Sequence, residues 1–154
     1  MARRVGKVLE LWEDDLNNLD LLARLHDLGK IAIPRHILNK PSSLTPREWK
    51  LIEKHPEVGY RIAESSPDLL PIAQAILAHH ERWDGTGYPR GLQGDVIPLL
   101  SRIIAVVDAY DVMTGGRPYK EPMSLKDAVA ELKRCAGSQF DPRVVEAFIR
   151  IAME

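Results

Sequence analysis

Frequent prolines and glycines divide this chain into short segments, and this pattern limits its fold more than any other feature. The 154 residues include 11 prolines and 10 glycines, and both residue types end or interrupt helices. Between them, apolar residues recur at helical spacing, and no segment shows the strict alternation of a half-exposed strand. The sequence therefore predicts an all-α fold, built as a compact bundle of several short helices.

Three helix starts combine a capping residue with a proline or an acidic side chain, which together satisfy the free N–H groups of a first turn. They are Thr45-Pro46-Arg47-Glu48, Ser124-Leu125-Lys126-Asp127 and Asp141-Pro142. Further helices are expected from Asn17 or Asn18 to a stop signal at Gly29, from Pro56 to Ser65-Ser66, from Pro67 to Arg82, and over residues 97–113. The proline-rich connection over residues 31–44 has no regular period, so we expect no helix there.

A long loop separates two of the expected helices. Residues 83–98, with the sequence WDGTGYPRGLQGDVIP, hold four of the ten glycines and two prolines. A loop of this length inside a small domain is often functional rather than a simple connection. We therefore expect residues 83–98 to take part in the function of the protein.

Composition and charge exclude several classes of protein. Hydrophobic residues make up 45% and charged residues 28%, and the formal net charge is -1, which excludes general nucleic-acid binding but allows a local basic pocket. The single cysteine, Cys135, cannot form an internal disulfide, which fits a reducing compartment. No apolar run approaches the roughly 18 residues of a membrane span, and the N-terminus has no signal-peptide pattern. We expect one soluble, cytoplasmic domain over residues 1–154, without a membrane segment.

The chain has only five histidines, and their positions suggest a common site. His26-Asp27 and His79-His80 each fall at the end of an apolar helix, and His55 lies at a helix junction. A single histidine is usually a surface residue or a satisfied core residue. Adjacent helical residues differ by about 100° in direction, so each pair can reach one cavity from two angles.

Asp108 lies within the most apolar helix of the chain. Burying a carboxylate there is costly unless it pairs with a base or binds a metal ion, so an ion pair with Arg102 or another base is the alternative to a metal ligand. Imidazole and carboxylate ligands suit Fe, Mn, Zn or Ni, whereas Mg prefers oxygen ligands. A carboxylate can also bridge two metals about 3.5–4 Å apart, and such pairs serve the hydrolysis of phosphate esters. The pattern indicates a metal site.

Several segments, taken in order, resemble one known family. They are LLARLHDLGKIAIP, ILNKPSSLTPREW, HPEVG, HHERWDGTGYPRGLQGDVIP, DAYDVMTGGRPYK and FDP, in register from about Leu22 to the C-terminus. This series is similar to that of the HD-GYP family, the branch of HD-type metal-dependent phosphohydrolases that degrades the bacterial second messenger cyclic di-GMP. The resemblance implies an HD-domain helical bundle with a long GYP loop, named for Gly87, Tyr88 and Pro89, and a role in signalling.

The resemblance also implies two divalent transition-metal ions, with Fe or Mn ahead of Zn or Ni. His26 and Asp27 match the HD pair, in which the aspartate bridges the two metals. The other implied ligands are Asp108 for the first metal and His55, His79 and His80 for the second. Lys30 follows Asp27 by three residues, so both can face one site. We expect Asp27 and Lys30 to be catalytic, with Lys30 stabilising the charge on the phosphate and a metal-activated hydroxide as the nucleophile.

Other residues match the family's contacts with its substrate, cyclic di-GMP. The implied contacts are Tyr88, Arg117, Tyr119 and Lys120, with Arg90 as a further phosphate contact. Trp83 offers another aromatic face for guanine, although a tryptophan just after a helix can equally close the core. His36 matches no ligand position, and we interpret it as an ordinary surface or core histidine.

These residues predict a metal-dependent phosphodiesterase that hydrolyses cyclic di-GMP to the linear dinucleotide or to GMP. Two alternatives stay open. The first is a catalytically degenerate domain that acts through ligand binding or through protein contacts, for example with GGDEF-domain proteins. The second is a phosphohydrolase that acts on another nucleotide. The GYP loop argues against the last of these.

One position departs from the family's pattern. In the family, an upstream helix supplies one more histidine, three residues before an Arg-Val pair, and often a glutamate four residues earlier. Here Arg4-Val5 would place that histidine at position 1, where Met1 stands. We therefore expect a first helix that is truncated, a first metal that lacks one nitrogen donor, and weak hydrolysis by this chain.

Overall fold

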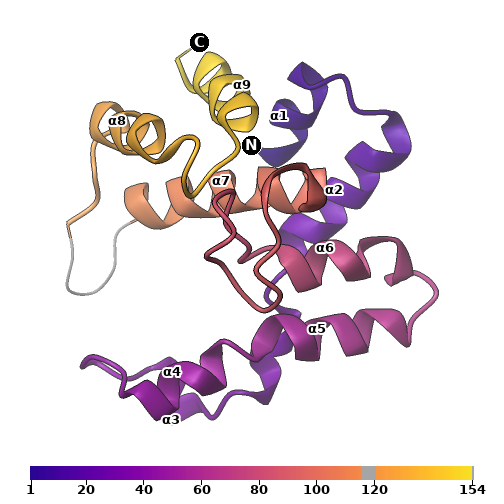
Figure 1. Ribbon diagram of the computed structural model, residues 1–154, viewed down its shortest axis with the longest axis vertical. Helices are drawn as coiled ribbons and strands as arrows, with labels where there is room; N and C mark the ends of the chain where they lie inside the picture. The colour runs from indigo at the N-terminus through magenta and orange to yellow at the C-terminus, as the bar shows by residue number, and fades with distance from the viewer. Residues whose placement is uncertain (116–120, 154) are drawn as a thin grey trace.

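The computed structural model describes residues 1–115 and 121–153, and its regular elements are helices (Figure 1). The α-helices are α1 (Ala2–Val8), α2 (Glu13–Leu25), α3 (Arg35–Leu38), α4 (Pro46–Ile52), α5 (His55–Glu64), α6 (Ala73–Ala78), α7 (Leu99–Thr114), α8 (Leu125–Cys135) and α9 (Pro142–Ala152). Short 3-10 helices lie at η1 (Leu28–Ala32), η2 (Leu70–Ile72) and η3 (Gly94–Val96). Within the described ranges the only strand-like pairs are isolated bridges, so the predicted all-α class is confirmed.

The predicted helix starts are confirmed by their capping hydrogen bonds. The Thr45 hydroxyl accepts from the Glu48 N–H, and the Glu48 carboxylate accepts from the Thr45 N–H, which completes a capping box. The Ser124 hydroxyl likewise accepts from the N–H of Asp127 at the start of α8. The Asp141 carboxylate accepts from the N–H two residues later at the start of α9.

The second helix begins earlier than the sequence predicted. It starts at Glu13 with Trp12 as its N-cap, so the expected cap at Asn17 or Asn18 is wrong. Three acidic residues fill the first turn, where the helix dipole favours negative charge. Arg3 of α1 also forms an ion pair with Glu13, which ties the two helices together at this end. Charge, rather than a capping side chain, sets this boundary.

Three other boundaries differ from expectation. Helix α2 ends at Leu25, and Gly29 lies inside η1 rather than at a helix end. The segment expected to be one helix from Pro67 to Arg82 contains η2 and then α6, because Pro71 lacks the N–H that a continuous helix needs at that point. The connection expected to be irregular contains the four-residue helix α3 and the last two residues of η1.

Helix α7 runs through the middle of the molecule and organises the core (Figure 1). Helices α1, α8 and α9 pack on one side of it, and α2 and α6 pack on the other. Fully buried side chains fill the contacts, among them Leu19, Leu22, Ile103, Val106 and Phe148. Because α2, α6 and α7 pack on one another, the helix ends that carry the candidate ligands come together on one face of this core.

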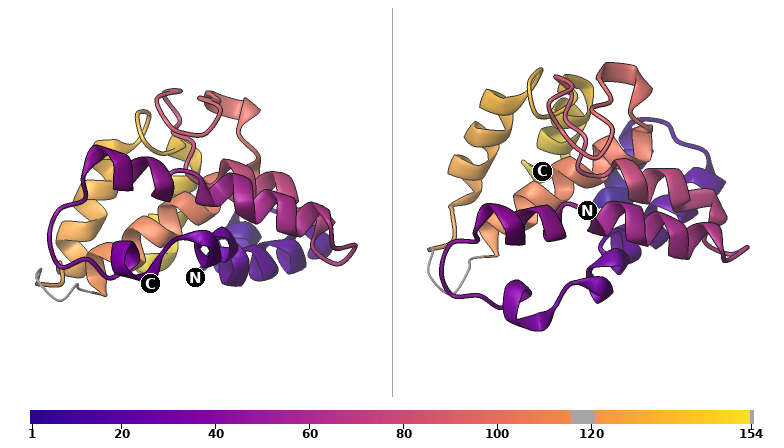
Figure 2. Two further views of the ribbon diagram at one scale, coloured as in Figure 1. Left: turned by 90° about the horizontal axis from the view of Figure 1, so that it is seen from below. Right: turned by 60° about the horizontal axis from the view of Figure 1, so that its bottom comes forward.

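Helices α3 and α4 form the lowest part of the molecule in Figure 1, beyond α5. We call residues 35–52 the α3–α4 arm. Both views in Figure 2 show the arm reaching outward from the pair formed by α5 and α6. Among the described helices, none combines the length and the apolar character of a membrane-spanning segment.

Candidate metal centre

Six predicted ligand residues converge from four parts of the chain. Their side chains come from the end of α2 and the turn after it, from the start of α5, from the turn after α6, and from the middle of α7. We call this set the histidine–aspartate cluster: His26, Asp27, His55, His79, His80 and Asp108. The predicted convergence of these six residues is therefore confirmed.

Gly29 allows two of these segments to approach. A Cβ atom at this position would lie 1.8 Å from the His55 carbonyl oxygen and 2.6 Å from the Gly59 nitrogen. No side chain fits at such distances, so η1 packs directly against the backbone of α5. This close packing holds Asp27, two residues before Gly29, beside the His55 imidazole.

Asp27 lies at the centre of the cluster. Its Oδ1 atom is 3.3 Å from His55 Nε2 and 3.7 Å from His79 Nε2. Its Oδ2 atom is 3.7 Å from His26 Nε2 and accepts a 2.6 Å hydrogen bond from Lys30 Nζ. The two oxygens thus face different groups of histidines, which is the arrangement that a bridging carboxylate requires.

The imidazole orientations leave lone pairs facing one another. His55 Nδ1 lies 2.6 Å from the Ile52 carbonyl oxygen, and His79 Nδ1 lies 2.5 Å from the Ile76 carbonyl oxygen. A carbonyl oxygen only accepts, so both Nδ1 atoms carry the hydrogen. In the neutral rings, the two Nε2 atoms are then both acceptors, yet they lie 3.2 Å apart. A metal ion resolves this conflict, and ligand histidines commonly donate their other N–H to a backbone carbonyl in this way.

The electrostatics of the cluster also favour a cation. Burial alone would raise the pKa of Asp27, but the Lys30 ammonium group that donates to its Oδ2 atom holds this pKa well below the usual range. Burial lowers the pKa of His79, and burial together with the neighbouring His79 and His55 lowers the pKa of His80 to about 3. The carboxylate is ionised and these two rings are neutral, which are the protonation states of metal ligands.

The donor set fits a divalent ion. One ligand atom each from Asp27, His55, His79 and His80 lies within 4.8 Å of the others. Asp27 Oδ1 is buried and has no hydrogen-bond partner among the described residues. A buried carboxylate oxygen that lacks a donor is costly, and coordination to a metal removes that cost. Mixed imidazole and carboxylate donors suit first-row transition metals.

Asp108 joins the cluster through His26. The Asp108 Oδ1 atom lies 3.8 Å from His26 Nε2, and His26 lowers the pKa of the carboxyl group. The alternative ion pair with Arg102 is wrong, because that guanidinium donates to Asp95 and Asp141 instead. His26 and Asp108 therefore form a second pair of donors on the Oδ2 side of Asp27.

The GYP loop packs directly on the cluster. A Cβ atom at Gly87 would lie 2.4 Å from the Arg82 nitrogen and 2.6 Å from the His80 carbonyl oxygen, so glycine is required there. The Tyr88 N–H donates to that carbonyl, and the Tyr88 ring stacks on His80 with centroids 5.0 Å apart. Burial raises the pKa of the Tyr88 hydroxyl to about 12. One face of Tyr88, which the sequence assigned to the substrate, thus rests on a candidate ligand.

Glu81 holds the GYP loop in place, and the sequence reasoning missed it. This residue is 5% exposed, and its carboxylate accepts hydrogen bonds from the N–H groups of Arg90 at 2.7 Å and Leu92 at 2.9 Å. The partners are backbone atoms nine and eleven residues away, so no pattern of side chains in the sequence predicts these hydrogen bonds. The one available signal was a carboxylate directly after the histidine pair.

Trp83 lies away from the metal centre. Its ring lies 5.7 Å from the Arg102 guanidinium and 6.0 Å from that of Arg143, and it borders a different cavity. The packing alternative for Trp83 is therefore supported over guanine stacking. We call the charged residues beneath it the arginine–aspartate cluster, which consists of Asp95, Arg102, Asp141 and Arg143.

A cleft of about 940 Å³ opens onto the metal centre, a size that suits a small ligand. Asp27, Lys30, His55, His80, Tyr88 and Asp108 line one part of it. Of the other predicted substrate contacts, Arg117, Tyr119 and Lys120 lie outside the described residues. His36 is exposed on α3 and is not part of the cluster, as expected.

Comparisons with known proteins agree with this arrangement. The HD domain family matches residues 1–144. A cyclic di-GMP phosphodiesterase of Thermotoga maritima is 42% identical over 156 residues, covering 100% of this chain and 42% of that protein. A 3'3'-cGAMP-specific phosphodiesterase of Vibrio cholerae is 40% identical over 150 residues, covering 96% of this chain and 29% of that protein. An HDG"Y"P protein from Bdellovibrio bacteriovorus has the same fold, with a TM-score of 0.73 at 21% identity over 97% of this chain and 48% of that one.

The chain therefore belongs to the HD domain family and to its HD-GYP branch, which confirms the resemblance found in the sequence. It spans 42% of the length of the Thermotoga maritima relative and 29% of the Vibrio cholerae one. The remainder of each relative lies beyond the region that the comparison covers.

Proposed function

We propose that this chain is a metal-dependent phosphodiesterase that hydrolyses cyclic di-GMP. The observation that carries the proposal is the arrangement around Asp27, whose two oxygens face two sets of donors beside a cleft. The name of the Thermotoga maritima relative supports cyclic di-GMP as the substrate. Because that substrate is an intracellular messenger in bacteria, we expect the protein to act in the cytoplasm.

Two groups of residues would hold two divalent ions, with Asp27 shared between them. His55, His79 and His80 would hold one ion on the Oδ1 side, and His26 and Asp108 would hold the other on the Oδ2 side. A bound divalent ion polarises phosphoryl oxygens and lowers the pKa of water, so that a nucleophile is available near neutral pH. We keep Fe and Mn ahead of Zn and Ni as the metals.

Lys30 would stabilise negative charge on the phosphodiester. Its ammonium group donates to Asp27 Oδ2 at 2.6 Å, which fixes its position at the edge of the cluster. The side chain is 39% exposed and lines the cleft, so its other two N–H groups remain available to a ligand. A fixed cation beside the reacting group lowers the energy of a transition state that gains negative charge.

Several residues would bind the rest of the substrate. Tyr88 lines the cleft and keeps its position through His80. Arg117, Tyr119 and Lys120 remain proposed contacts with the second phosphate and the bases, because a planar guanidinium can bind a phosphate through two hydrogen bonds. We propose the linear dinucleotide or GMP as the product, and GGDEF-domain proteins as partners of the GYP loop.

A second candidate substrate is 3'3'-cGAMP, which the name of the Vibrio cholerae relative supports. The two cyclic dinucleotides share both phosphodiesters and differ in one purine. The metal centre would act on a phosphodiester, which both compounds carry, so a preference for one of them would come from residues that contact the bases.

The test measures metal content and turnover together. The chain is purified, loaded with Fe(II) or Mn(II), and assayed with cyclic di-GMP and 3'3'-cGAMP, with Asp27→Asn as the control for contaminating hydrolases. We expect bound metal and hydrolysis of at least one cyclic dinucleotide, both lost in the control. Bound metal without turnover of either compound overturns the proposal and favours the degenerate domain.

A further inference from the structure

The α3–α4 arm contributes a large aromatic side chain to the wall of the cleft that opens onto the metal centre. Trp49 of α4 lines the same cleft as Asp27 and Lys30, and it is 48% exposed. No aromatic ring or cation of the described residues stacks on it, in contrast to Trp83 and Tyr88. Trp49 therefore has a ring surface that is open to a ligand in the cleft.

Trp49 does not hold its helix to a hydrophobic core. Every residue of α4 is described, and none of them is fully buried. The helix is fixed instead by the capping box at Thr45 and by a 2.7 Å ion pair between Lys40 and Glu48. An aromatic side chain that is half exposed and that the fold does not need for packing is a common feature of ligand-binding surfaces.

The cleft divides into two chemically different parts. Asp27, Lys30 and Asp108 form a charged part, beside His55 and His80. The arm contributes a part with little charge, because its Lys40 is already neutralised by Glu48. The apolar side chains there are Ile37, Leu38, Pro41, Leu44, Trp49 and Ile52. A ligand that matches both parts carries an anionic group at one end and a flat, weakly polar group at the other, and a nucleotide has this character.

We propose that Trp49 is a substrate-binding residue that stacks a purine base while the attached phosphodiester lies against Lys30 and the histidine–aspartate cluster. The inference rests on the proposed function, because a base-bearing substrate is assumed. Tyr88 has one ring face against His80, whereas the Trp49 ring is free of such contacts among the described residues. A base stacks on an aromatic side chain through its π-face, which every purine offers.

The experiment compares a ligand that has a base with one that lacks it. Isothermal titration of the metal-loaded chain gives the dissociation constants of GMP and of inorganic phosphate. We expect Trp49→Ala to weaken GMP binding about tenfold and to leave phosphate binding within about twofold. Trp49→Phe, which keeps a ring, is expected to retain most of the affinity for GMP.

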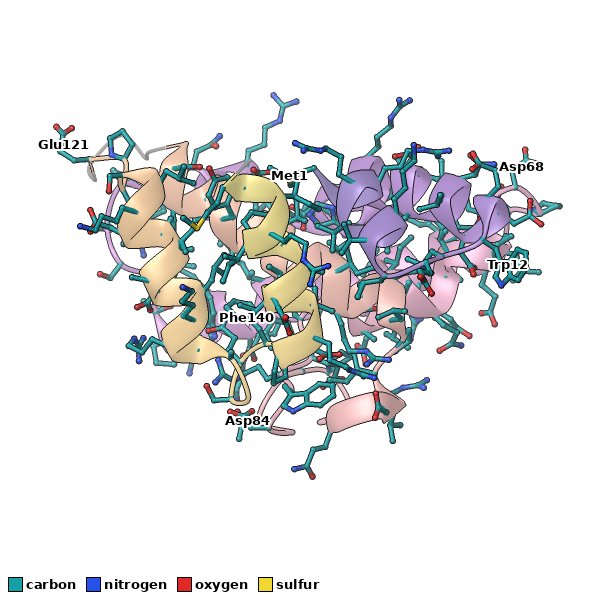
Figure 3. All side chains as sticks on the ribbon, turned by 90° about the horizontal axis from the view of Figure 1, so that it is seen from above. Met1, Trp12, Asp68, Asp84, Glu121 and Phe140 are labelled. Atoms are coloured by element: carbon teal, nitrogen blue, oxygen red, sulfur yellow. The ribbon has the colours of Figure 1, made fainter. Side chains whose placement is uncertain are left out.

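Trp12 provides the matched control. It is 83% exposed, and Figure 3 shows it at the edge of the molecule, on the segment that joins α1 to α2. Trp12→Ala removes an equally large aromatic surface without touching the cleft, so both dissociation constants are expected to stay unchanged. Because Trp49→Ala risks disturbing the arm, tryptophan emission in a Trp12→Phe/Trp83→Phe background, where Trp49 is the one remaining tryptophan, gives an independent reading. GMP should quench it and phosphate should not.

The outcomes separate this inference from the proposed function. Unchanged GMP binding in Trp49→Ala, or equal losses of GMP and phosphate binding, overturns the role of Trp49 even when the wild-type chain hydrolyses cyclic di-GMP. A selective loss of GMP binding supports it. Failure of the wild-type chain to hydrolyse any cyclic dinucleotide overturns the proposed function alone, since the binding measurement needs no turnover.

Discussion

The two polar clusters of this molecule both join segments that are distant in the sequence, but only one of them balances its own charges. In the arginine–aspartate cluster, each carboxylate accepts from guanidinium groups, with Arg102 bonded to Asp95 and Asp141 at 2.8 Å. In the histidine–aspartate cluster, Asp27 Oδ1 lacks a donor and two imidazole acceptors face each other. The first cluster pairs two carboxylates with two guanidinium groups, although the buried Arg102 Nε has no hydrogen-bond partner among the described residues. The second cluster leaves carboxylate charge without a matching cation.

This difference separates a structural cluster from a functional one. A paired buried charge contributes to folding chiefly because removing one partner leaves the other unpaired. An incomplete cluster costs stability and is explained by a ligand that it binds. Mutations in the histidine–aspartate cluster should therefore affect metal content and turnover, whereas mutations in the arginine–aspartate cluster should affect the free energy of unfolding.

The largest effect is expected from Asp27→Ala. The shared carboxylate serves both sets of donors, so its loss should remove both metals and lower turnover by at least about a thousandfold. The free energy of unfolding of the metal-free chain should change far less than the metal content, because the unpartnered Oδ1 is removed together with the Lys30 hydrogen bond to Oδ2. Elemental analysis, turnover and denaturant unfolding measure these three quantities. Equal metal content in the variant and the wild type would show that Asp27 is not the shared ligand.

The opposite pattern is expected from Asp141→Ala. The Asp141 side chain is fully buried, pairs with Arg102, and caps α9. Its removal leaves the nearly buried guanidinium without its buried partner, and the free energy of unfolding should fall by about 3 kcal/mol. Metal content per folded molecule should stay the same. Asp95→Ala, at an exposed carboxylate of the same cluster, is the control and should destabilise much less.

The two clusters also differed in how far the sequence predicted them. His26, Asp27 and Asp108 were identified because a histidine–aspartate pair and a carboxylate among apolar residues are unusual and follow a known order. The arginine–aspartate cluster was not, because Arg102 and Asp141 are 39 residues apart and charged pairs carry no spacing signal. Arg102 was considered as a partner of Asp108, whereas it donates to Asp95 and Asp141.

Local chemistry predicted the helices better than it predicted their lengths. The cap at Thr45 was readable from adjacent residues, since its partners lie within one turn. The start of α2 was not, because Arg3 from another helix pairs with its first turn. The need for glycine at position 29 likewise depends on the backbone of α5, which no local pattern reveals.

A smaller effect is expected at the boundary between the two clusters, where Glu81 ties the GYP loop to the turn after α6. Glu81→Gln keeps the size of the side chain but leaves one oxygen to serve two backbone N–H groups. Loss of one charge-assisted hydrogen bond should cost about 2 kcal/mol. Amide hydrogen exchange over residues 83–98 should accelerate, because the loop loses an anchor. Metal content should remain, and unchanged exchange would mean that the loop holds its position without Glu81.

The smallest effect is expected from completing the donor set at position 1. The resemblance places a histidine where Met1 stands, and the structure brings this end of α1 near the cluster. Burial raises the pKa of Asp111, one turn beyond Asp108 on α7, and the positive amino terminus of Met1 acts in the opposite direction. A side chain at position 1 therefore lies within electrostatic reach of the helix that carries Asp108.

We expect Met1→His, in a chain extended upstream by a helix with glutamate four residues earlier, to raise metal occupancy on the Oδ2 side of Asp27. Turnover should increase about three- to tenfold, because the other donors are already in place. The matched control is the same extension with Met kept at position 1, which separates the ligand from the added helix. A chelator titration should then remove metal in one step from the histidine variant and in two steps from the control. If the two extended chains show equal metal content and equal turnover, position 1 takes no part in the metal centre, and His26, Asp27 and Asp108 suffice for the first ion.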